Sequence, residues 1–268
     1  MLVTLNEVTV SYTDKKILDN VSFSINDNDK IGIVGINGTG KSTLLKTILG
    51  EVDIQSGEIF RKSGIKIAYL PQQPKFDENA SIIDTALKES KVDNEYEIKA
   101  MLSKLGIDNL DSKISTLSGG EKRRLALAIT LVKQCDLLIL DEPTNHLDIW
   151  MINWLEKYLT KWSKALLLVT HDRYFLERVV NRIIEIDHGQ IYKYEANYSK
   201  YLELKQVRLE TQLSSQRKRK LFLKKELEWV RAGVQARTTK SKDRLQRFEE
   251  NKLLFHLESP CFHARLAA

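Results

Sequence analysis

The segment from Gly35 to Thr43 reads GINGTGKST and constrains the fold of this chain more than any other feature. It matches the phosphate-loop pattern G-x-x-x-x-G-K-[ST], a glycine-rich turn between a strand and a helix. The apolar run Lys30–Val34 suits the strand, and Lys41–Leu49 has helical spacing. An anion held by the turn would therefore lie at a helix N-terminus. The pattern predicts a nucleoside triphosphate site in an α/β fold, and a plain glycine turn is the alternative.

Each residue type in this loop has a chemical reason to be there. Glycines allow backbone turns that a Cβ would forbid, so that successive N–H groups can point at phosphate oxygens. Lys41 adds a positive charge for the β- and γ-phosphates, and the Ser42 hydroxyl can ligate Mg²⁺. The predicted ATP-binding residues of the loop are Gly35, Asn37, Gly38, Gly40, Lys41, Ser42 and Thr43.

Composition narrows the class of protein. The chain has 268 residues, 42% of them hydrophobic, which is enough for a full core. No apolar run approaches the length of a membrane span, and the N-terminus does not read as a signal peptide. The two cysteines, Cys135 and Cys261, are too few for a disulfide framework or a zinc site. We therefore expect a cytoplasmic protein.

Charge divides the chain into unequal parts. Residues 205–247 contain fourteen Lys or Arg against four Asp or Glu, a net charge of +10. Because the whole chain has a formal net charge of +6, the remainder carries −4. We expect a globular domain over residues 1–198, a basic helical linker over 199–250, and an atypical tail over 251–268.

Strand-like and helix-like runs alternate through the globular part, as in an α/β fold with a parallel core sheet. Helical runs over 81–104 and Glu121–Lys133 fall within a predicted helical subdomain of about residues 73–134. The expected strands are Val3–Tyr12 and Ile17–Ile25 in an antiparallel layer, then Ile65–Leu70, Asp136–Leu140 and, as the last, Ala165–Thr170.

The acidic pair Asp141-Glu142 follows the apolar strand Asp136–Leu140. Parallel sheets bind their ligands at this carboxyl end of the strands. Asp141 can hold Mg²⁺, while Glu142 can orient and polarise the water that attacks the γ-phosphate. A helix-capping acidic turn before Pro143 is the alternative.

Two further motifs resemble a known family. Leu117–Glu121 reads LSGGE and Leu137–Asp148 reads LLILDEPTNHLD; with the phosphate loop, this order is similar to the ABC family of cassette ATPases. The resemblance implies a RecA-like parallel sheet, an antiparallel β layer and a helical subdomain. It also implies that two cassettes clamp ATP head to tail. Ser118, Gly119 and Gly120 would then contact the γ-phosphate held by the other cassette, again from a helix N-terminus.

The resemblance assigns roles to single residues. Tyr12 is similar to the aromatic residue that stacks on adenine, although simple packing is the alternative. Gln72 resembles the glutamine that reaches Mg²⁺ and the attacking water, and the neighbouring Gln73 leaves that assignment open. Asp148 resembles the residue that couples the two cassettes. His171 resembles the histidine that bonds the γ-phosphate, against a purely structural role. The predicted catalytic set is Lys41, Gln72, Glu142 and His171, and the predicted Mg²⁺ ligands are Ser42, Gln72 and Asp141.

The wording NHLD at 145–148 and the segment NYSKY at 197–201, followed by basic residues, resemble ABC-F proteins. These carry two cassettes in one chain and act on ribosomes, with a helical linker that projects toward rRNA and tRNA near the E site. Two other classes stay open: a soluble ATPase subunit of an ABC transporter, and an ABC ATPase acting on DNA.

The linker can also be interpreted physically. Residues 198–231 contain no proline or glycine and predict a helix of about 50 Å, which we expect to fold back on a second helix after Gly233. On that second helix, four basic residues share one face and are predicted to contact RNA, a solvated coiled-coil face being the alternative. They are Arg237, Lys240, Arg244 and Arg247.

Only one phosphate loop and one LSGGE are present, where an ABC-F chain has two of each. The tail at 251–268 loses the helical pattern and suggests a truncated end. We therefore expect the second cassette to be missing or to be supplied by a second copy of the chain, and ATP hydrolysis by one cassette alone to be weak.

Overall fold

The computed structural model describes residues 1–12, 15–92 and 94–231. The chain divides into two compact units, Met1–Leu202 and Glu203–Ala268. The strands are β1 (Val3–Tyr12), β2 (Lys15–Ile25), β3 (Lys30–Val34), β4 (Ser56–Arg61), β5 (Ile67–Leu70), β6 (Leu137–Asp141), β7 (Ala165–Val169), β8 (Arg182–Asp187) and β9 (Gln190–Tyr194). The helices are α1 (Lys41–Leu49), α2 (Ile82–Ser90), α3 (Glu95–Lys104), the short 3-10 helix η1 (Ile114–Thr116), α4 (Gly119–Val132), α5 (Ile149–Thr160), α6 (Arg173–Val179) and α7 (Tyr198–Arg231).

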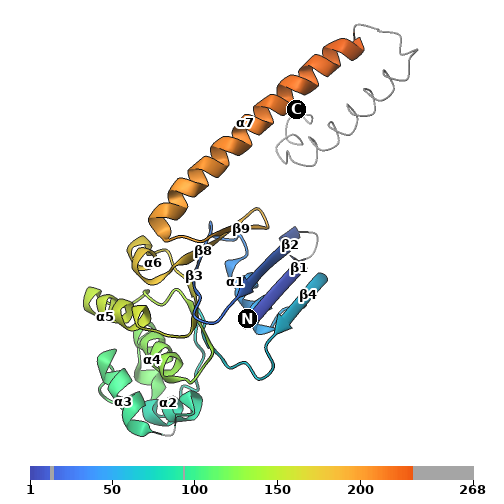
Figure 1. Ribbon diagram of the computed structural model, residues 1–268. Coiled ribbons are helices and arrows are strands. Elements are labelled where there is room, and N and C mark those ends of the chain that lie inside the picture. The colour runs from blue at the N-terminus through green and yellow to red at the C-terminus, as the bar shows by residue number, and fades with distance from the viewer. Residues whose placement is uncertain (13–14, 93, 232–268) are drawn as a thin grey trace, which may run out of the picture. The chain divides into compact units, whose positions relative to one another are not determined.

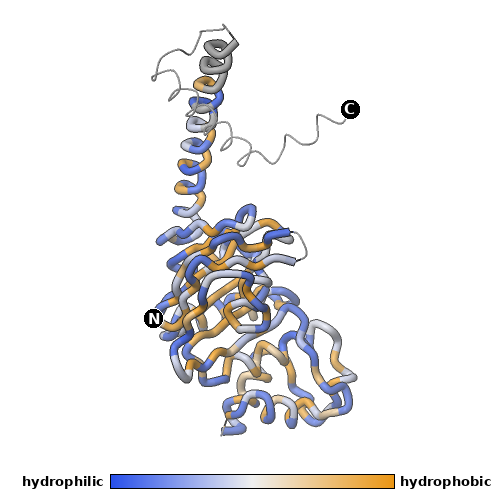
Figure 2. The backbone as a smooth tube through the Cα atoms, turned by 90° about the vertical axis from the view of Figure 1, so that its right-hand side faces the viewer, coloured by the Kyte–Doolittle hydropathy of each residue, from blue (hydrophilic) through white to orange (hydrophobic). Residues whose placement is uncertain are grey.

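The core of the first unit is a six-stranded sheet in the order β5-β6-β7-β3-β8-β9. Its first five strands run parallel, and β9 pairs antiparallel with β8. β6 and β7 are buried at every position, as expected for parallel strands covered on both faces. Figure 2 shows the hydrophobic segments concentrated inside this unit. The predicted α/β fold with a parallel core sheet is confirmed.

A second sheet has the order β2-β1-β4 and is antiparallel. It confirms the predicted antiparallel layer, which lies beside α1 in Figure 1. Sequence reasoning missed β4, whose six residues are nearly all exposed and so lack an apolar pattern. Its turn into the sheet needs Gly57, where a Cβ would lie 2.4 Å from the Glu7 carbonyl oxygen.

The prediction that Ala165–Thr170 is the last strand is wrong, because β8 and β9 follow it. They form a hairpin in which Asp187 pairs with Gln190 across a two-residue loop. Both loop residues, His188 and Gly189, have positive φ, at 48° and 78°. Such loops match the twist of paired strands. The His-Gly pair between two apolar runs is the signal that sequence reasoning overlooked.

The predicted helical run over 81–104 is two helices, α2 and α3. Lys91 caps α2 in the left-handed region, with φ of 54°, and the Asn94 side chain caps α3 by accepting the Tyr96 N–H. In Figure 1 these helices gather with α4 at one end of the unit. Their apolar faces pack together through Ile82, Ile98 and Leu102, which are buried; the bounds of a helical subdomain at about residues 73–134 stay a prediction.

The predicted linker helix is confirmed over Tyr198–Arg231, as α7. Leu209 and Leu213 on it are 40% and 54% exposed, and hydrophobic and polar residues alternate along it in Figure 2. The predicted second helix, its basic residues Arg237, Lys240, Arg244 and Arg247, and the tail at 251–268 lie outside the described residues.

Candidate functional site

The strand order brings the predicted site residues to one edge of the core sheet. β5, β6, β7 and β3 are neighbours and run parallel, so their carboxyl ends meet there. Gln72 follows β5, Asp141 ends β6, His171 follows β7, and the phosphate loop follows β3. Segments more than a hundred residues apart in sequence therefore contribute to one place.

Close packing around the phosphate loop explains two of its glycines. A Cβ on Gly40 would lie 2.7 Å from Ile17 Cγ2, and Gly40 has a φ of 107°. A Cβ on Gly35 would lie 2.7 Å from the Ile186 carbonyl oxygen. Strand β2 and the end of β8 thus pack against the loop backbone and leave no room for a side chain at Gly40 and Gly35.

Lys41 lies inside the loop and bonds to it. Its Nζ donates to the carbonyl oxygens of Gly35 at 2.8 Å and Ile36 at 3.1 Å. Burial lowers the pKa of the Lys41 ammonium, and the nearby carboxylates of Glu142 and Asp141 oppose that shift. A bound polyphosphate would add to the groups that favour the charged form.

The acidic pair is almost completely buried, with Asp141 3% and Glu142 6% exposed. Burial is the main reason that the pKa of Asp141 is raised, and the Glu142 charge adds to it, while Arg123 and Lys41 act in the opposite direction. Glu142 has an unusual φ of 55° for a residue other than glycine. Its Oε1 lies 3.4 Å from His171 Nε2, and its Oε2 accepts the His171 backbone N–H at 3.4 Å.

A cavity of about 440 Å³ opens at this edge of the sheet. Ten of the predicted residues line it: Asn37, Gly38, Gly40, Lys41, Ser42, Thr43, Gln72, Asp141, Glu142 and His171. Gln73 is not among its lining residues, so Gln72 is the glutamine that the structure brings to the site. Sequence reasoning missed Ile17, Asn145 and Val169 as lining residues. Asn145 belongs to the NHLD motif, which sequence reasoning interpreted only as a mark of the family, and Ile17 and Val169 carry no motif.

The donor set in this cavity fits Mg²⁺ bound to a nucleotide. The Ser42 hydroxyl, the Asp141 carboxylate and the Gln72 amide all line it, and Mg²⁺ prefers oxygen ligands. Among the described residues, no cluster of three or more His, Cys, Asp or Glu side chains could hold a metal alone.

Of the other predicted residues, Gly35 lies in the phosphate loop without lining the cavity, and the rest are also absent from the lining. Tyr12 is 49% exposed at the end of β1. Ser118, Gly119 and Gly120 stand at the N-terminus of α4, and Asp148 caps α5 by accepting the Met151 N–H at 2.8 Å. The capping box of α4 pairs Ser118 with Glu121: the Ser118 hydroxyl accepts the Glu121 N–H at 3.3 Å, and the Glu121 carboxylate accepts the Ser118 N–H at 2.8 Å.

Arg123 is the most informative residue that sequence reasoning missed. It lies on α4, is only 7% exposed, and donates hydrogen bonds to backbone carbonyls beneath the site. In the sequence it is the middle of Lys122-Arg123-Arg124, three consecutive basic residues with no pattern that distinguishes one from the others. Only the fold reveals that one of the three side chains points inward.

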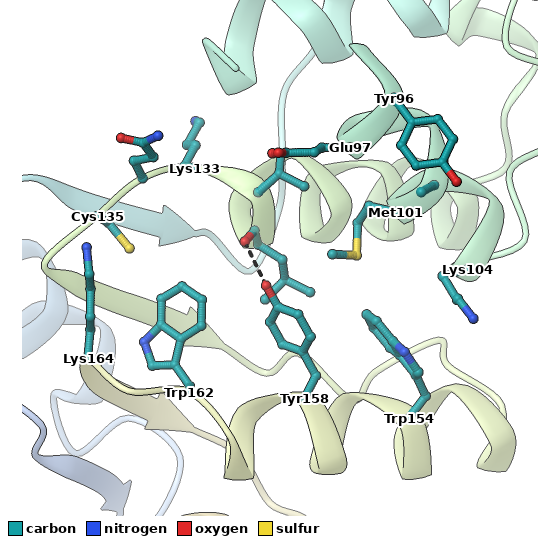
Figure 3. A pocket seen from close by; sticks show the side chains of 14 residues that line it. Tyr96, Glu97, Met101, Lys104, Lys133, Cys135, Trp154, Tyr158, Trp162 and Lys164 are labelled. Atoms are coloured by element: carbon teal, nitrogen blue, oxygen red, sulfur yellow. Dashed lines mark hydrogen bonds between the residues drawn. The ribbon is translucent and has the colours of Figure 1, made fainter. Parts of the chain in front are cut away.

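A second cavity of about 560 Å³ lies between α3, the end of α4 and α5 (Figure 3). Trp154 and Tyr158 on α5 and Trp162 just beyond the end of this helix form a row, with successive ring centroids 5.4 and 6.0 Å apart. This larger cavity shares no lining residue with the first and has neither the phosphate loop nor the acidic pair. The nucleotide chemistry therefore belongs to the smaller cavity.

Comparison with known protein families agrees with this geometry. Two family models, both described as ABC transporter, match residues 18–145 and 184–260. The chain belongs to the ABC family. Its cassette is an ATPase cassette, and the predicted resemblance and fold are confirmed. Among the described residues, no helix is long and apolar enough to cross a membrane.

Relatives of known name cover most of this chain. A Bacillus subtilis protein named uncharacterized ABC transporter ATP-binding protein YfmR is 39% identical, over 90% of this chain and 45% of the relative. The energy-dependent translational throttle protein EttA of Mycobacterium tuberculosis is 37% identical, over 92% of this chain and 51% of the relative. EttA of Escherichia coli is 37% identical, over 88% of this chain and 50% of the relative. The chain thus spans about half the length of the curated relatives it matches.

Solved structures support the fold alone. An ATP-binding subunit of an ABC transporter matches with a TM-score of 0.67 at 22% identity, over 76% of this chain and 100% of that one. The ATP-binding cassette MJ0796, a dimer in a post-hydrolysis state bound to ADP and Pi, matches with a TM-score of 0.63 at 23% identity, over 72% of this chain and 98% of that one.

Proposed function

We propose that this chain binds ATP with Mg²⁺ in the smaller cavity and hydrolyses it to ADP and phosphate. The observation that carries the proposal is the convergence of four strand ends on one cavity, which places Lys41, Asp141, Glu142 and His171 together. A phosphate loop and an acidic strand end side by side are the parts that phosphoryl transfer to water requires.

Each residue has a distinct task in this proposal. Lys41 and the loop N–H groups hold the β- and γ-phosphates. Ser42, Asp141 and Gln72 would hold Mg²⁺, which when bound would supply charge stabilisation at the phosphates. The Glu142 carboxylate orients and polarises the attacking water. His171, whose Nε2 lies 3.4 Å from Glu142 Oε1, faces the γ-phosphate.

A single cassette supplies only half of the proposed reaction site. Ser118, Gly119 and Gly120 do not line the cavity of their own chain, in agreement with a role at a site held by another cassette. We propose that two cassettes close head to tail around ATP. Turnover by this chain should then be weak and rise more than linearly with protein concentration; strictly proportional turnover would count against the sandwich.

Glu142→Gln tests the assignment of the catalytic carboxylate. The amide keeps the shape of the side chain but cannot accept a proton from water, so ATP should bind normally and trap the closed dimer. Turnover should fall by roughly 100-fold or more. Size-exclusion chromatography with and without ATP reports the trapped dimer. Normal turnover by this variant would contradict the assignment.

We further propose that cassette closure is coupled to ribosome binding in translation, with residues 1–198 as cassette and 199–250 as a basic linker that contacts RNA. The EttA relatives are named as translational throttle proteins, and their similarity extends over 92% and 88% of this chain. A family model also matches residues 184–260, which include the proposed linker. The net charge of +10 over residues 205–247 suits a polyanionic partner. Such a factor would act in the cytoplasm.

Ribosome coupling can be tested by cosedimentation. The Glu142→Gln chain, joined to a second cassette, should pellet with ribosomes in ATP but not without it, at moderate salt. Salt is needed because basic helices bind any RNA nonspecifically. Equal pelleting with and without ATP would sink the ribosome role. Preference for branched DNA over ribosomes would favour the DNA class, and binding to neither would favour the transporter class.

A further inference from the structure

Arg123 joins the N-terminal part of α4 to the backbone beneath the proposed catalytic residues. It lies five residues after Ser118, and its side chain crosses to the carboxyl ends of β5 and β6. Its Nη2 donates to the carbonyl oxygens of Asp141 and Glu142, each at 2.7 Å, and its Nη1 donates to the Gln72 carbonyl oxygen. One guanidinium therefore contacts three of the proposed site residues at the main chain.

The geometry suits arginine and no other residue type. A guanidinium presents a rigid, planar fork of donors, whereas a lysine ammonium is a single point. The carbonyl oxygens lie in two segments that have no direct chain connection, one after β5 and one at the end of β6. Because Arg123 is 7% exposed, water cannot easily replace its donors at these oxygens.

The turn that Arg123 holds is strained. Glu142 has a φ of 55°, which side chains other than glycine rarely adopt. Its N–H donates to the Val169 carbonyl at 2.7 Å, and its carbonyl accepts from Arg123 and from the Asn145 N–H at 3.3 Å. These bonds fix both sides of the residue, and so fix the direction in which its carboxylate points toward His171.

We propose that Arg123 is a positioning residue for ATP hydrolysis: it holds the strained turn that aims Glu142, and it ties this turn and Gln72 to α4. The inference rests on the proposed ATPase function. Since Ser118 is the N-cap of α4, a movement of the helix N-terminus against a second cassette would be transmitted through the Arg123 side chain to the catalytic carboxylate of the same chain.

A double-mutant cycle tests the proposal on the full chain. Arg123→Ala should lower kcat by roughly 10- to 100-fold, because a displacement of about 1 Å at a catalytic group is enough for that loss. The Kd for ATP should change by less than about threefold, since the phosphate loop is untouched. Arg123→Lys should recover part of kcat. Arg178→Ala, which removes an exposed arginine paired with Glu156 at 3.1 Å, is the matched control and should leave both constants unchanged.

The same substitution in the Glu142→Gln background separates positioning from general damage. If Arg123 acts by aiming the Glu142 carboxylate, Arg123→Ala should change the residual single-turnover rate of Glu142→Gln by less than about twofold. A loss of similar size in both backgrounds would overturn the proposal, as would wild-type kcat in Arg123→Ala. If Arg123→Ala does not fold, Arg123→Lys and Arg123→Gln carry the same comparison. Absence of turnover in the unsubstituted chain would instead refute the proposed ATPase function.

Discussion

Two helices of the cassette begin at glycine-bearing motifs. The N-terminus of one is capped by side chains of its own chain, and the N-terminus of the other, within the described residues, is not. α1 begins after Gly40, and no side chain in the described part of the chain caps it; its first turn contains no acidic residue. α4 begins after Ser118 and has a complete capping box, with the Glu121 carboxylate in its first turn. Both ends carry the partial positive charge of a helix N-terminus.

This difference separates a site built within the chain from a surface presented to another molecule. The first residues of α1, Lys41, Ser42 and Thr43, line the cavity, and the first turn of the helix has no competing carboxylate, so this N-terminus suits a phosphate. At α4 the chain supplies its own anion, and Ser118 and Gly119 are exposed. A γ-phosphate that bound at the α4 N-terminus would have to bind beside the capping box of Ser118 and Glu121 or displace the Glu121 carboxylate.

The largest expected effect is at α1. Lys41→Ala removes the only side-chain cation that lines the described cavity, and with it the charge that meets the β- and γ-phosphates. ATP binding should weaken strongly, and turnover should fall by roughly 100-fold or more. Titration with a fluorescent ATP analogue and a phosphate-release assay measure the two losses. Lys46→Ala, which removes an exposed lysine later on the same helix, is the control. If both variants lost ATP binding and turnover equally, Lys41 would have no special role at the α1 N-terminus.

A smaller effect is expected at α4, and only on the closed state. A Cβ on Gly119 would meet no atom of the described chain within 4 Å, so Gly119→Ala should fold normally. It should bind ATP with unchanged affinity, yet turnover should drop by about 10-fold, because the new methyl group stands where a second cassette would approach. ATP titration and turnover at high protein concentration test this split. Weakened ATP binding by the isolated cassette would show that α4 serves its own cavity.

Part of the fold and of the candidate site could be predicted from the sequence. The phosphate loop, the strand before it and α1 follow from Gly35–Thr43 because a local pattern fixes all three. The acidic pair could be placed because it ends an apolar run. His171 and Gln72 needed the family resemblance, since one histidine or glutamine at a strand end carries no pattern of its own.

What escaped prediction depends on contacts distant in sequence. The exposed strand β4 exists because β1 offers it an edge, and its own residues give no apolar alternation. Arg123 is buried only because three carbonyl oxygens from two other segments meet it. The strained φ of Glu142 is likewise imposed by its surroundings, and neighbouring residues in the sequence do not encode it.

The capping box itself should contribute measurable stability. Ser118→Ala removes the side chain that accepts the Glu121 N–H and should destabilise the fold by about 1 kcal/mol, as loss of an N-cap typically does. Urea unfolding measures this. Ser81→Ala is the matched control, because Ser81 caps α2 in the same way by accepting the Asp84 N–H at 3.1 Å. Both variants should lose similar stability, and only Ser118→Ala should also lose turnover. If turnover fell equally in both variants, Ser118 would act only as a structural cap.

The smallest expected effect is the pH dependence of the same box. Hydrogen bonds from the Ser118 side chain and backbone hold the pKa of Glu121 below its ordinary value of 4.5. A carboxyl group with a lowered pKa in the folded state stabilises the fold above its ordinary pKa, and this stabilisation is lost as pH falls through the folded value. Glu121→Gln should therefore lower the Tm slightly at pH 7, and the difference from the unsubstituted chain should shrink as pH falls below 4.5 and vanish once Glu121 is protonated in the folded state. If the Glu121→Gln difference persisted unchanged in acid, the box would not rest on the ionised carboxylate, and the contrast between α1 and α4 would lose its electrostatic basis.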